Sequence, residues 1–141
     1  MMRAALYRRR GSASEVLSVE EVKTPAPGPG EVRVRIRASG VNPTDWKARK
    51  GSGVSSPPLA DFQIPHHDGA GLVDAVGPGV TSRAVGDRVW VYFAAVQNRY
   101  GTAAEYTIVP AVRTVPLPDE ASFELGASLG IPAVTAAYCL G

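Results

Sequence analysis

The residues best suited to chemistry are the run His66-His67-Asp68 and the single cysteine, Cys139. Imidazole nitrogens, carboxylates and thiolates are the ligands that zinc takes in proteins, so these residues raise the question of a metal. Adjacent side chains on an extended chain point to opposite faces, which makes His66 and His67 poor partners for one ion. A lone thiol excludes an internal disulfide and is typical of a reducing compartment. We therefore expect no bound metal and a cytoplasmic protein.

The elements that must position these residues are mostly strands. Glycine and proline number 15 and 12 among the 141 residues, and short segments between such turn residues are typical of an all-β sandwich or barrel. The clearest strand covers residues 32–38, where Val32, Val34 and Ile36 alternate with arginines, so that one face is apolar. Together with it we expect seven or eight strands, the others including residues 2–7, 16–22, 69–77, 88–93, 104–109 and 112–117.

A short helix is expected soon after the arginine-bearing strand. The hydroxyl of Thr44 can accept a free N–H of the first turn, so this residue is expected to cap a helix running through Arg49. Residues 51–58, which are rich in Gly, Ser and Pro, are expected to form a loop.

Near the C-terminal end the period of the sequence changes from strand to helix. Ser122 can cap one helix, with Glu124 in the first turn, where the helix dipole favours an acid. A second helix is expected to begin near Pro132, because proline suits the first helical turn. We therefore expect a β-rich domain over residues 1–121 and a helical connection over residues 122–141.

Composition and charge exclude several function classes. The net charge of +2 is too weak a bias to indicate a nucleic-acid partner. Hydrophobic residues make up 45% and charged residues 20%, as in an ordinary globular protein. No apolar run approaches the roughly 20 residues that cross a bilayer, so no membrane partner is expected. No apolar stretch follows the arginines within residues 1–10, so a secretory signal is not expected either.

Three stretches of sequence occur in one order along almost the whole chain. They are SGVNPTDWKARKG at residues 39–51, IPHHDGAGLVDAVGPGV at 64–80 with GDRV at 86–89, and VPLPD at 115–119 with GIPAVTA at 130–136. In this order and spacing they resemble the quinone oxidoreductases of the medium-chain dehydrogenase/reductase superfamily. The type that they resemble is the zinc-free, NADPH-dependent, zeta-crystallin-like one.

The resemblance implies a particular architecture. Members of the family have a mainly β, GroES-like catalytic domain, which is a partly open β-barrel with a short active-site helix and a C-terminal helical segment. They also have a Rossmann domain, and the nicotinamide lies in the cleft between the two. A Rossmann fingerprint places G-x-G-x-x-G between a strand and a helix, and the run GAG at residues 69–71 lacks the third glycine. The Rossmann domain is therefore expected to be absent from this sequence, with most of the NADPH site supplied in cis or by a partner chain.

The near relatives of that family are zinc-dependent alcohol dehydrogenases, so the positions of their ligands matter. Where they carry a cysteine after SGV, this sequence has Asn42, and Pro43 beside it has no ligand atom. His67 and Asp68 fall where they carry His-Glu, and His66 falls where most reductases carry glycine. The resemblance implies a zinc-free protein, in which His67 is a vestigial ligand, a hydrogen-bonding residue of the cleft wall or a surface residue.

The reaction that the resemblance implies is direct hydride transfer from NADPH to a quinone or an activated alkene such as an enone. The candidate catalytic residues are Asn42 and Asp45. The amide of Asn42 could donate to the substrate oxygen or hold the nicotinamide ribose, unless the residue serves only in a turn. Asp45 could cap or orient the Asn42 loop, which we favour over a catalytic role. Thr135 matches the family threonine that faces the nicotinamide, although it could instead fill a packing position.

The substrate cleft is expected to include Pro43, Trp46, His67 and Asp68. Trp46 could wall the cleft or lie in the core, and Asp68 is expected to hold the loop under the site. The sequence does not fix the substrate, the choice between NADPH and NADH, or the oligomeric state. A homo-oligomer is possible, because an uncovered docking surface for the missing domain would favour self-association.

Two other functions stay open at this point. One is a non-catalytic GroES-like module that binds a partner or needs a partner chain for activity. The other is a zinc alcohol dehydrogenase relative that has lost its metal.

Overall fold

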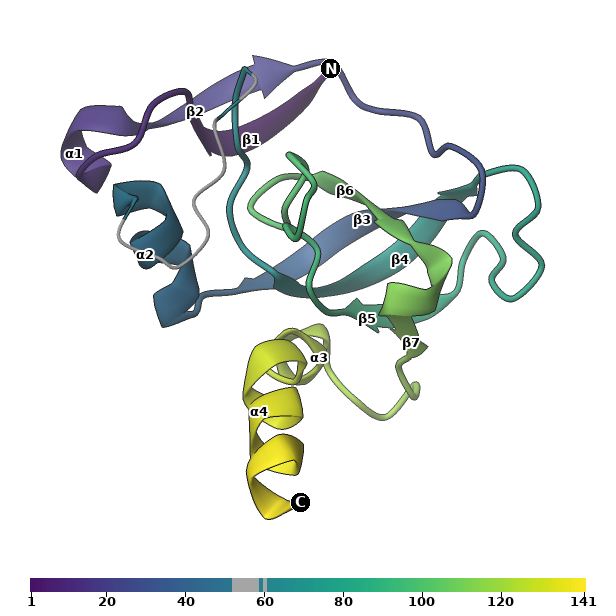
Figure 1. Ribbon diagram of the computed structural model, residues 1–141. Coiled ribbons are helices and arrows are strands. Elements are labelled where there is room, and N and C mark those ends of the chain that lie inside the picture. The colour runs from purple at the N-terminus through teal and green to yellow at the C-terminus, as the bar shows by residue number, and fades with distance from the viewer. Residues whose placement is uncertain (52–58, 60) are drawn as a thin grey trace.

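The computed structural model describes residues 1–51, 59 and 61–141 of the chain. All but the first residue of the loop expected over 51–58 lies outside the described residues. Within the described part, two sheets carry the fold (Figure 1). One is an antiparallel hairpin of β1 (Met2–Tyr7) and β2 (Leu17–Val22).

The second sheet has five antiparallel strands in the order β6-β3-β4-β5-β7. The hairpin forms isolated bridges to segments outside the named strands, such as that between Ala4 and Ala104, which lies just before β6. Neither sheet closes on itself, so the expected mainly β, partly open barrel is confirmed. The bounds of the strands are β3 (Glu31–Gly40), β4 (Asp68–Val76), β5 (Arg88–Val91), β6 (Tyr106–Pro110) and β7 (Thr114–Pro116).

Most expected strands lie close to their predicted positions, and two differ for identifiable reasons. β5 ends at Val91, and Phe93 has a positive φ of 53°, which no extended strand accommodates. The extended piece expected over 112–117 is instead a 3₁₀ turn, η1 (Ala111–Arg113), followed by the short β7. A short helix, α1 (Ala13–Val16), also occupies part of a segment that the sequence indicated as turn and strand.

The main core fills the interior of the five-stranded sheet. Val32 and Val34 are fully buried, as their alternation with arginines on β3 predicts, and they pack with valines of β4, β5 and β6. Gly71 on β4 is required for this packing, because a Cβ there would lie 1.9 Å from the carbonyl oxygen of Arg35. Arg33 is not simply solvated, since its guanidinium pairs with Asp74 at 2.8 Å.

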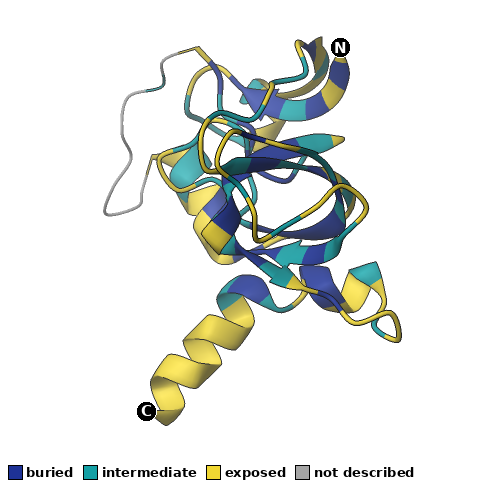
Figure 2. Ribbon diagram, turned by 90° about the vertical axis from the view of Figure 1, so that its right-hand side faces the viewer, coloured by how far each residue is buried: buried dark blue, intermediate teal, exposed yellow. Residues whose placement is uncertain are grey.

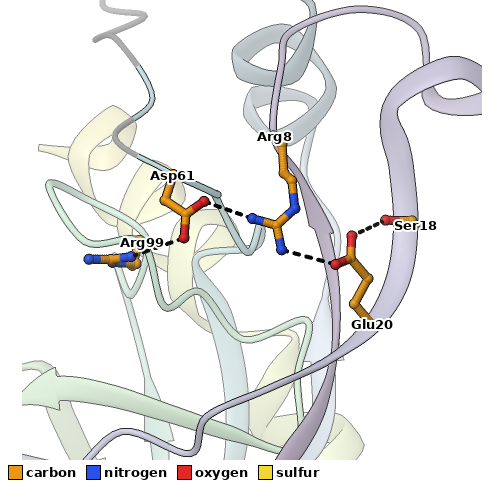
Figure 3. A network of polar contacts seen from close by, with 5 residues as sticks. All are labelled: Arg8, Ser18, Glu20, Asp61 and Arg99. Atoms are coloured by element: carbon orange, nitrogen blue, oxygen red, sulfur yellow. Dashed lines mark hydrogen bonds and ion pairs between the residues drawn. The ribbon is translucent and has the colours of Figure 1, made fainter.

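The hairpin is held to the rest of the domain by a second core and by surface ion pairs. Its apolar side chains, including Met2 and Leu6, bury Ile64. On the surface, Arg8 donates to Asp61 at 2.7 Å and to Glu20 at 3.0 Å (Figure 3). These ion pairs are solvent-exposed and contribute little to stability, so the buried side chains carry most of the attachment.

Helix α2 (Pro43–Lys50) follows β3 directly, and its cap differs from the expectation. The N-cap is Asn42 rather than Thr44, because Pro43 occupies the first helical position, where its missing N–H costs nothing. Gly51 ends the helix in the left-handed conformation, with a φ of 81°. The helix therefore begins at Pro43, one residue before the expected cap.

On the side away from the hairpin, one helix packs against the sheet and a second projects away from it (Figure 1). The hydroxyl of Ser122 accepts the N–H of Leu125, which confirms the expected cap of α3 (Phe123–Ala127). Helix α4 (Gly130–Leu140) begins two residues before Pro132, which therefore lies inside the first turn. Beyond that turn α4 is exposed along its length (Figure 2). None of the helices in the described residues has the length and apolar character needed to cross a membrane.

Candidate functional site

The start of α2 is fixed by a carboxylate three residues into the helix. Asp45 is buried, and its Oδ2 accepts the backbone N–H of Asn42 at 2.7 Å, which is the reciprocal contact of a capping box. This contact holds the backbone at residue 42 and leaves the Asn42 amide nitrogen for another partner. Asp45 therefore positions Asn42.

That partner is Asp68, the first residue of β4 and one of the most buried polar residues, with 1% of its surface exposed. Asn42 Nδ2 donates to Asp68 Oδ2 at 2.8 Å. Both oxygens of Asp68 also accept the N–H of Ile131, at 3.0 and 3.1 Å, in the first turn of α4. Gly130 makes this approach possible, because a Cβ there would lie 2.2 Å from Asp68 Oδ1. One carboxylate thus joins α2, β4 and α4.

A cavity of about 330 Å³ opens beside this junction, between the end of β3 and the two C-terminal helices. Its polar lining comes from Ser39, Asn42, Asp68, Glu124 and Ser128. The remaining lining residues are small or apolar: Ala38, Gly40, Val41, Ala127 and Pro132. The cavity thus combines polar groups with an apolar wall, and its volume lies in the range of small-molecule sites.

A chain of hydrogen bonds runs from the wall of this cavity toward solvent. Thr102, which is completely buried, donates its hydroxyl to the backbone carbonyl of Asp68 at 2.6 Å. Ser39 Oγ lies 2.8 Å from Thr102 Oγ1 and also 2.8 Å from His66 Nδ1. Sequence reasoning missed this chain, because its three side chains come from three separate segments. The signal was His66 itself, which stands where most reductases carry glycine.

The backbone at His66 explains why glycine would suit that position. His66 has a φ of 81°, in the left-handed region, which costs a non-glycine residue on the order of 1–3 kcal/mol. Its carbonyl oxygen accepts the N–H of Thr102 at 3.0 Å, so the strained backbone is held by its neighbours.

Comparison with known proteins identifies the fold to which this site belongs. Residues 28–119 match the family model of the alcohol dehydrogenase GroES-like domain. The chain belongs to this family. Within it, the GroES-like domain is of the quinone oxidoreductase type of the medium-chain superfamily.

Three relatives illustrate the similarity. Quinone oxidoreductase of Rattus norvegicus is 38% identical over 127 residues, which are 89% of this chain and 37% of the relative. The crystal structure of a Pseudomonas syringae quinone oxidoreductase superposes with a TM-score of 0.88 at 34% identity, over 99% of this chain and 41% of that one. A mycobacterial protein in complex with NADPH gives a TM-score of 0.85 at 32% identity, over 99% and 40%. The chain thus spans well under half the length of these relatives.

The GroES-like domain brings together only some of the residues singled out from the sequence. Asn42 and Asp68 line the cavity, and Asp45 lies directly behind Asn42. Trp46 is 45% exposed, so it is not a core residue, and the ammonium groups of Lys47 and Lys50 lie over its ring. These exposed residues lie on α2, on the surface of the domain.

The remaining candidates lie at the margins of the site. Pro43 is exposed at the start of α2, and Thr135 is exposed on α4, five residues after Gly130. His67 is half-buried, and its Nδ1 is the one buried side-chain nitrogen or oxygen without a hydrogen-bond partner in the described part of the chain. No side-chain hydrogen bond joins Pro43, His67 or Thr135 to another described residue.

Burial shifts the titration of the groups around the cavity. It raises the pKa of Asp45, while the N–H of Asn42 and the nearby His67 act in the opposite direction. Burial lowers the pKa of His67 against the attraction of the carboxylates of Asp45 and Asp68, and it lowers the pKa of His66 against that of Asp68. Both histidines are therefore favoured in the neutral form at pH 7.

The donor set at the site can also be examined for a metal. Across residues 1–51, 59 and 61–141, no three His, Cys, Asp or Glu side chains come together as a metal-binding group. Asn42 presents an amide rather than a thiolate, and that amide nitrogen donates to Asp68. Cys139 is exposed near the C-terminal end of α4, of which only Pro132, in the first turn, lines the cavity.

Proposed function

We propose that this GroES-like domain forms the substrate side of an NADPH-dependent reductase that passes hydride to a quinone or an activated alkene without a metal. The observation that supports this most is the Asn42–Asp68 hydrogen bond at the cavity wall. An amide nitrogen carries two hydrogens, and Asp68 takes one of them. The other remains to donate to a substrate carbonyl oxygen, where negative charge develops as hydride arrives.

The lining residues fit the ribonicotinamide end of the cofactor. Asn42 and Ser39 supply neutral polar groups, and the small residues Gly40 and Ala127 lie beside them in the lining. NADPH supplies the hydride when it is bound, and the chain's own residues orient the acceptor and exclude water. Thr135 is proposed to meet the nicotinamide from α4, where its side chain is exposed.

Helix α4 supports the proposal that a nucleotide-binding domain, in cis or on a partner chain, docks on this surface. From Pro132 to Leu140 every residue of the helix is exposed, and most of them are apolar. A helix that is apolar all round is normally buried on all sides. Residues 1–121 are accordingly proposed as the GroES-like domain and residues 122–141 as the connection to the nucleotide domain.

The experiment uses a hybrid enzyme, in which residues 1–141 replace the matching 41% of the Pseudomonas syringae quinone oxidoreductase. We expect NADPH oxidation that depends on added 1,4-naphthoquinone and is unchanged after dialysis against a chelator. The unmodified Pseudomonas protein is the control for assembly. Loss of activity on dialysis, restored by zinc, would contradict the metal-free reaction. A hybrid that binds NADPH but reduces neither a quinone nor an enone would support the non-catalytic alternative.

A further inference from the structure

The hydrogens in the chain of Ser39, His66 and Thr102 can be assigned by counting. A backbone carbonyl only accepts, so the Thr102 hydroxyl hydrogen points to the carbonyl oxygen of Asp68, 2.6 Å away. Thr102 Oγ1 can then only accept from Ser39, at 2.8 Å. Ser39 has no second hydrogen, so at the 2.8 Å contact His66 Nδ1 is the donor. The chain therefore has one direction, from His66 through Ser39 and Thr102 to the carbonyl.

The two ends of this chain lie in different surroundings. Ser39 lines the cavity, and the Thr102–Asp68 contact is buried beneath it. His66 is half-buried, and its contact with Ser39 is at the exposed end. Among the described residues, no hydrogen bond is made to His66 Nε2, and the side chain lies at the exposed end of the chain of hydrogen bonds. In the neutral ring with a proton on Nδ1, that Nε2 is a free acceptor.

The backbone conformation of His66 is strained. Its φ of 81° favours glycine, and His66 belongs to none of the hydrophobic core clusters of the described residues. Strained residues that persist in a fold are concentrated at functional sites. The side chain held at this cost is the one that reaches Ser39.

We propose that Ser39 is the acid that protonates the reduced substrate and that His66 replaces its proton from solvent. This rests on the proposed reductase function. Hydride transfer to a quinone carbon or oxygen adds two electrons and one hydrogen, and leaves one oxygen as an anion. The Ser39 hydroxyl hydrogen turns from Thr102 Oγ1 to the substrate oxygen, and the Ser39 O–H bond breaks as the substrate O–H bond forms, while Nδ1–H of His66 passes its proton to Ser39 Oγ. His66 Nε2 takes one proton from water, so the net change is one solvent proton on the product. The ring is then protonated at Nε2, and exchange of protons with water returns it to the Nδ1–H form.

The same pair is a poor nucleophile and base, although serine and histidine lie within 2.8 Å of each other. A base must accept the serine proton at Nδ1, whereas here Nδ1 is the donor and the proton of Ser39 points to Thr102. The hydrogen-bond direction thus distinguishes delivery of a proton from activation of the hydroxyl.

The first test uses the 141-residue chain itself. Long-range ¹H–¹⁵N NMR of the histidine rings at pH 7 is expected to show His66, assigned by the loss of its signals in His66→Gly, as the neutral ring protonated at Nδ1. The charged groups that face it are Asp68 and, when protonated, His67. A ring protonated at Nε2 alone would overturn the proposal, because such a ring cannot donate to Ser39.

The second test uses the hybrid enzyme with 1,4-naphthoquinone. Ser39→Ala and His66→Gly are each expected to lower kcat about 10- to 100-fold, and added imidazole is expected to restore His66→Gly but not Ser39→Ala. His66→Gly also relieves the strained backbone, so its thermal midpoint is expected to stay the same or rise, which excludes misfolding as the cause. Ser18→Ala, which removes a hydroxyl bonded to Glu20 on the hairpin, is the matched control.

The outcomes separate this proposal from the reductase function on which it rests. If the unsubstituted hybrid reduces no quinone, the proposed function fails. If it reduces quinone and both variants match it, the function stands and the proton pathway is overturned. A loss of kcat in His66→Gly without recovery in imidazole also overturns it, because His66 would then act only on structure.

Discussion

Asn42 donates its side-chain amide to Asp68 across 2.8 Å, and this hydrogen bond fixes the direction of the amide at the cavity. A carboxylate only accepts, so the NH₂ group of Asn42 must face Asp68. The same carboxylate receives the N–H of Ile131, which ties the first turn of α4 to the cavity wall. The geometry of the site and the attachment of α4 therefore depend on the same two residues.

The first prediction concerns a second carboxylate at position 42. Asn42→Asp places two acids about 2.8 Å apart, so the pKa of one is raised in the folded state. An acid with a raised folded pKa contributes stability below its unfolded pKa, and this is lost as pH rises through the folded value. We expect Asn42→Asp to be more destabilising at pH 8 than at pH 4 in urea unfolding.

Asn42→Ala is the matched control for that measurement. It removes a donor from Asp68 without adding a charge, at a cost of about 1–3 kcal/mol for the unpaired buried group. Because it adds no acid, its cost is expected to be nearly the same at pH 8 and at pH 4. An equal pH dependence for the two variants would contradict the close Asn42–Asp68 contact.

The second prediction concerns the attachment of α4. Gly130→Ala puts a Cβ 2.2 Å from Asp68 Oδ1, so the first turn of α4 must move away and lose the Ile131 contact. We expect a loss of about 1–3 kcal/mol in the free energy of unfolding, although alanine alone favours a helix by about 1 kcal/mol. Ala136→Gly, an exposed position on the same helix, measures that propensity separately. Stabilisation by Gly130→Ala would show that Asp68 does not hold this turn.

The sequence predicts strands well where apolar and polar residues alternate strongly. It does not predict how neighbouring strands align with each other. β3 was predicted because Val32 and Val34 alternate with arginines. The cavity depends on Gly40 pairing opposite Asp68, and that register includes shifts between Arg33 and Val34 and between Ile36 and Ala38. No local pattern encodes such bulges, because they satisfy the partner strand rather than the residues themselves.

The same reason explains which parts of the site were found in advance. Asn42, Asp45 and Asp68 are singled out by the sequence because the motifs that resemble the family carry them at fixed spacing. The contact of Ser39 with His66 joins residues 27 positions apart and requires the positive φ at His66, which sequence alone does not give. Thr44 is not the N-cap, because Pro43 prefers the first helical position and so moves the cap to Asn42.

The third prediction concerns the pH dependence contributed by Asp45. Burial raises its pKa, so the ionised form costs stability, and that cost appears as pH rises through the folded pKa. Asp45→Asn keeps an oxygen that can accept the N–H of Asn42 but removes the charge. We expect the parent to lose stability relative to Asp45→Asn as the pH rises from 4 to 7, so that the unfolding free energy of the parent minus that of the variant decreases. The opposite trend would mean that the charged hydrogen bond outweighs burial.

The fourth prediction concerns the exposed surface of α4. Tyr138 and Leu140 are 88% and 90% exposed, and a contiguous apolar surface of this kind favours association. We expect sedimentation of the 141-residue chain to show concentration-dependent association. Replacing both residues by glutamate is expected to reduce it, with Val112→Glu, an exposed apolar residue outside α4, as the control. A strictly monomeric parent chain at high concentration would show that α4 is not a docking surface.

The most direct test of the proposed function is the kcat/KM of the hybrid enzyme for 1,4-naphthoquinone, compared between the parent and Asn42→Ala at pH 7. If the Asn42 amide donates to the reacting oxygen, the variant loses about 10-fold or more, while Ser18→Ala does not change. If the two hybrids reduce quinone with equal kcat/KM, Asn42 does not contact the reacting groups and the proposed site is wrong.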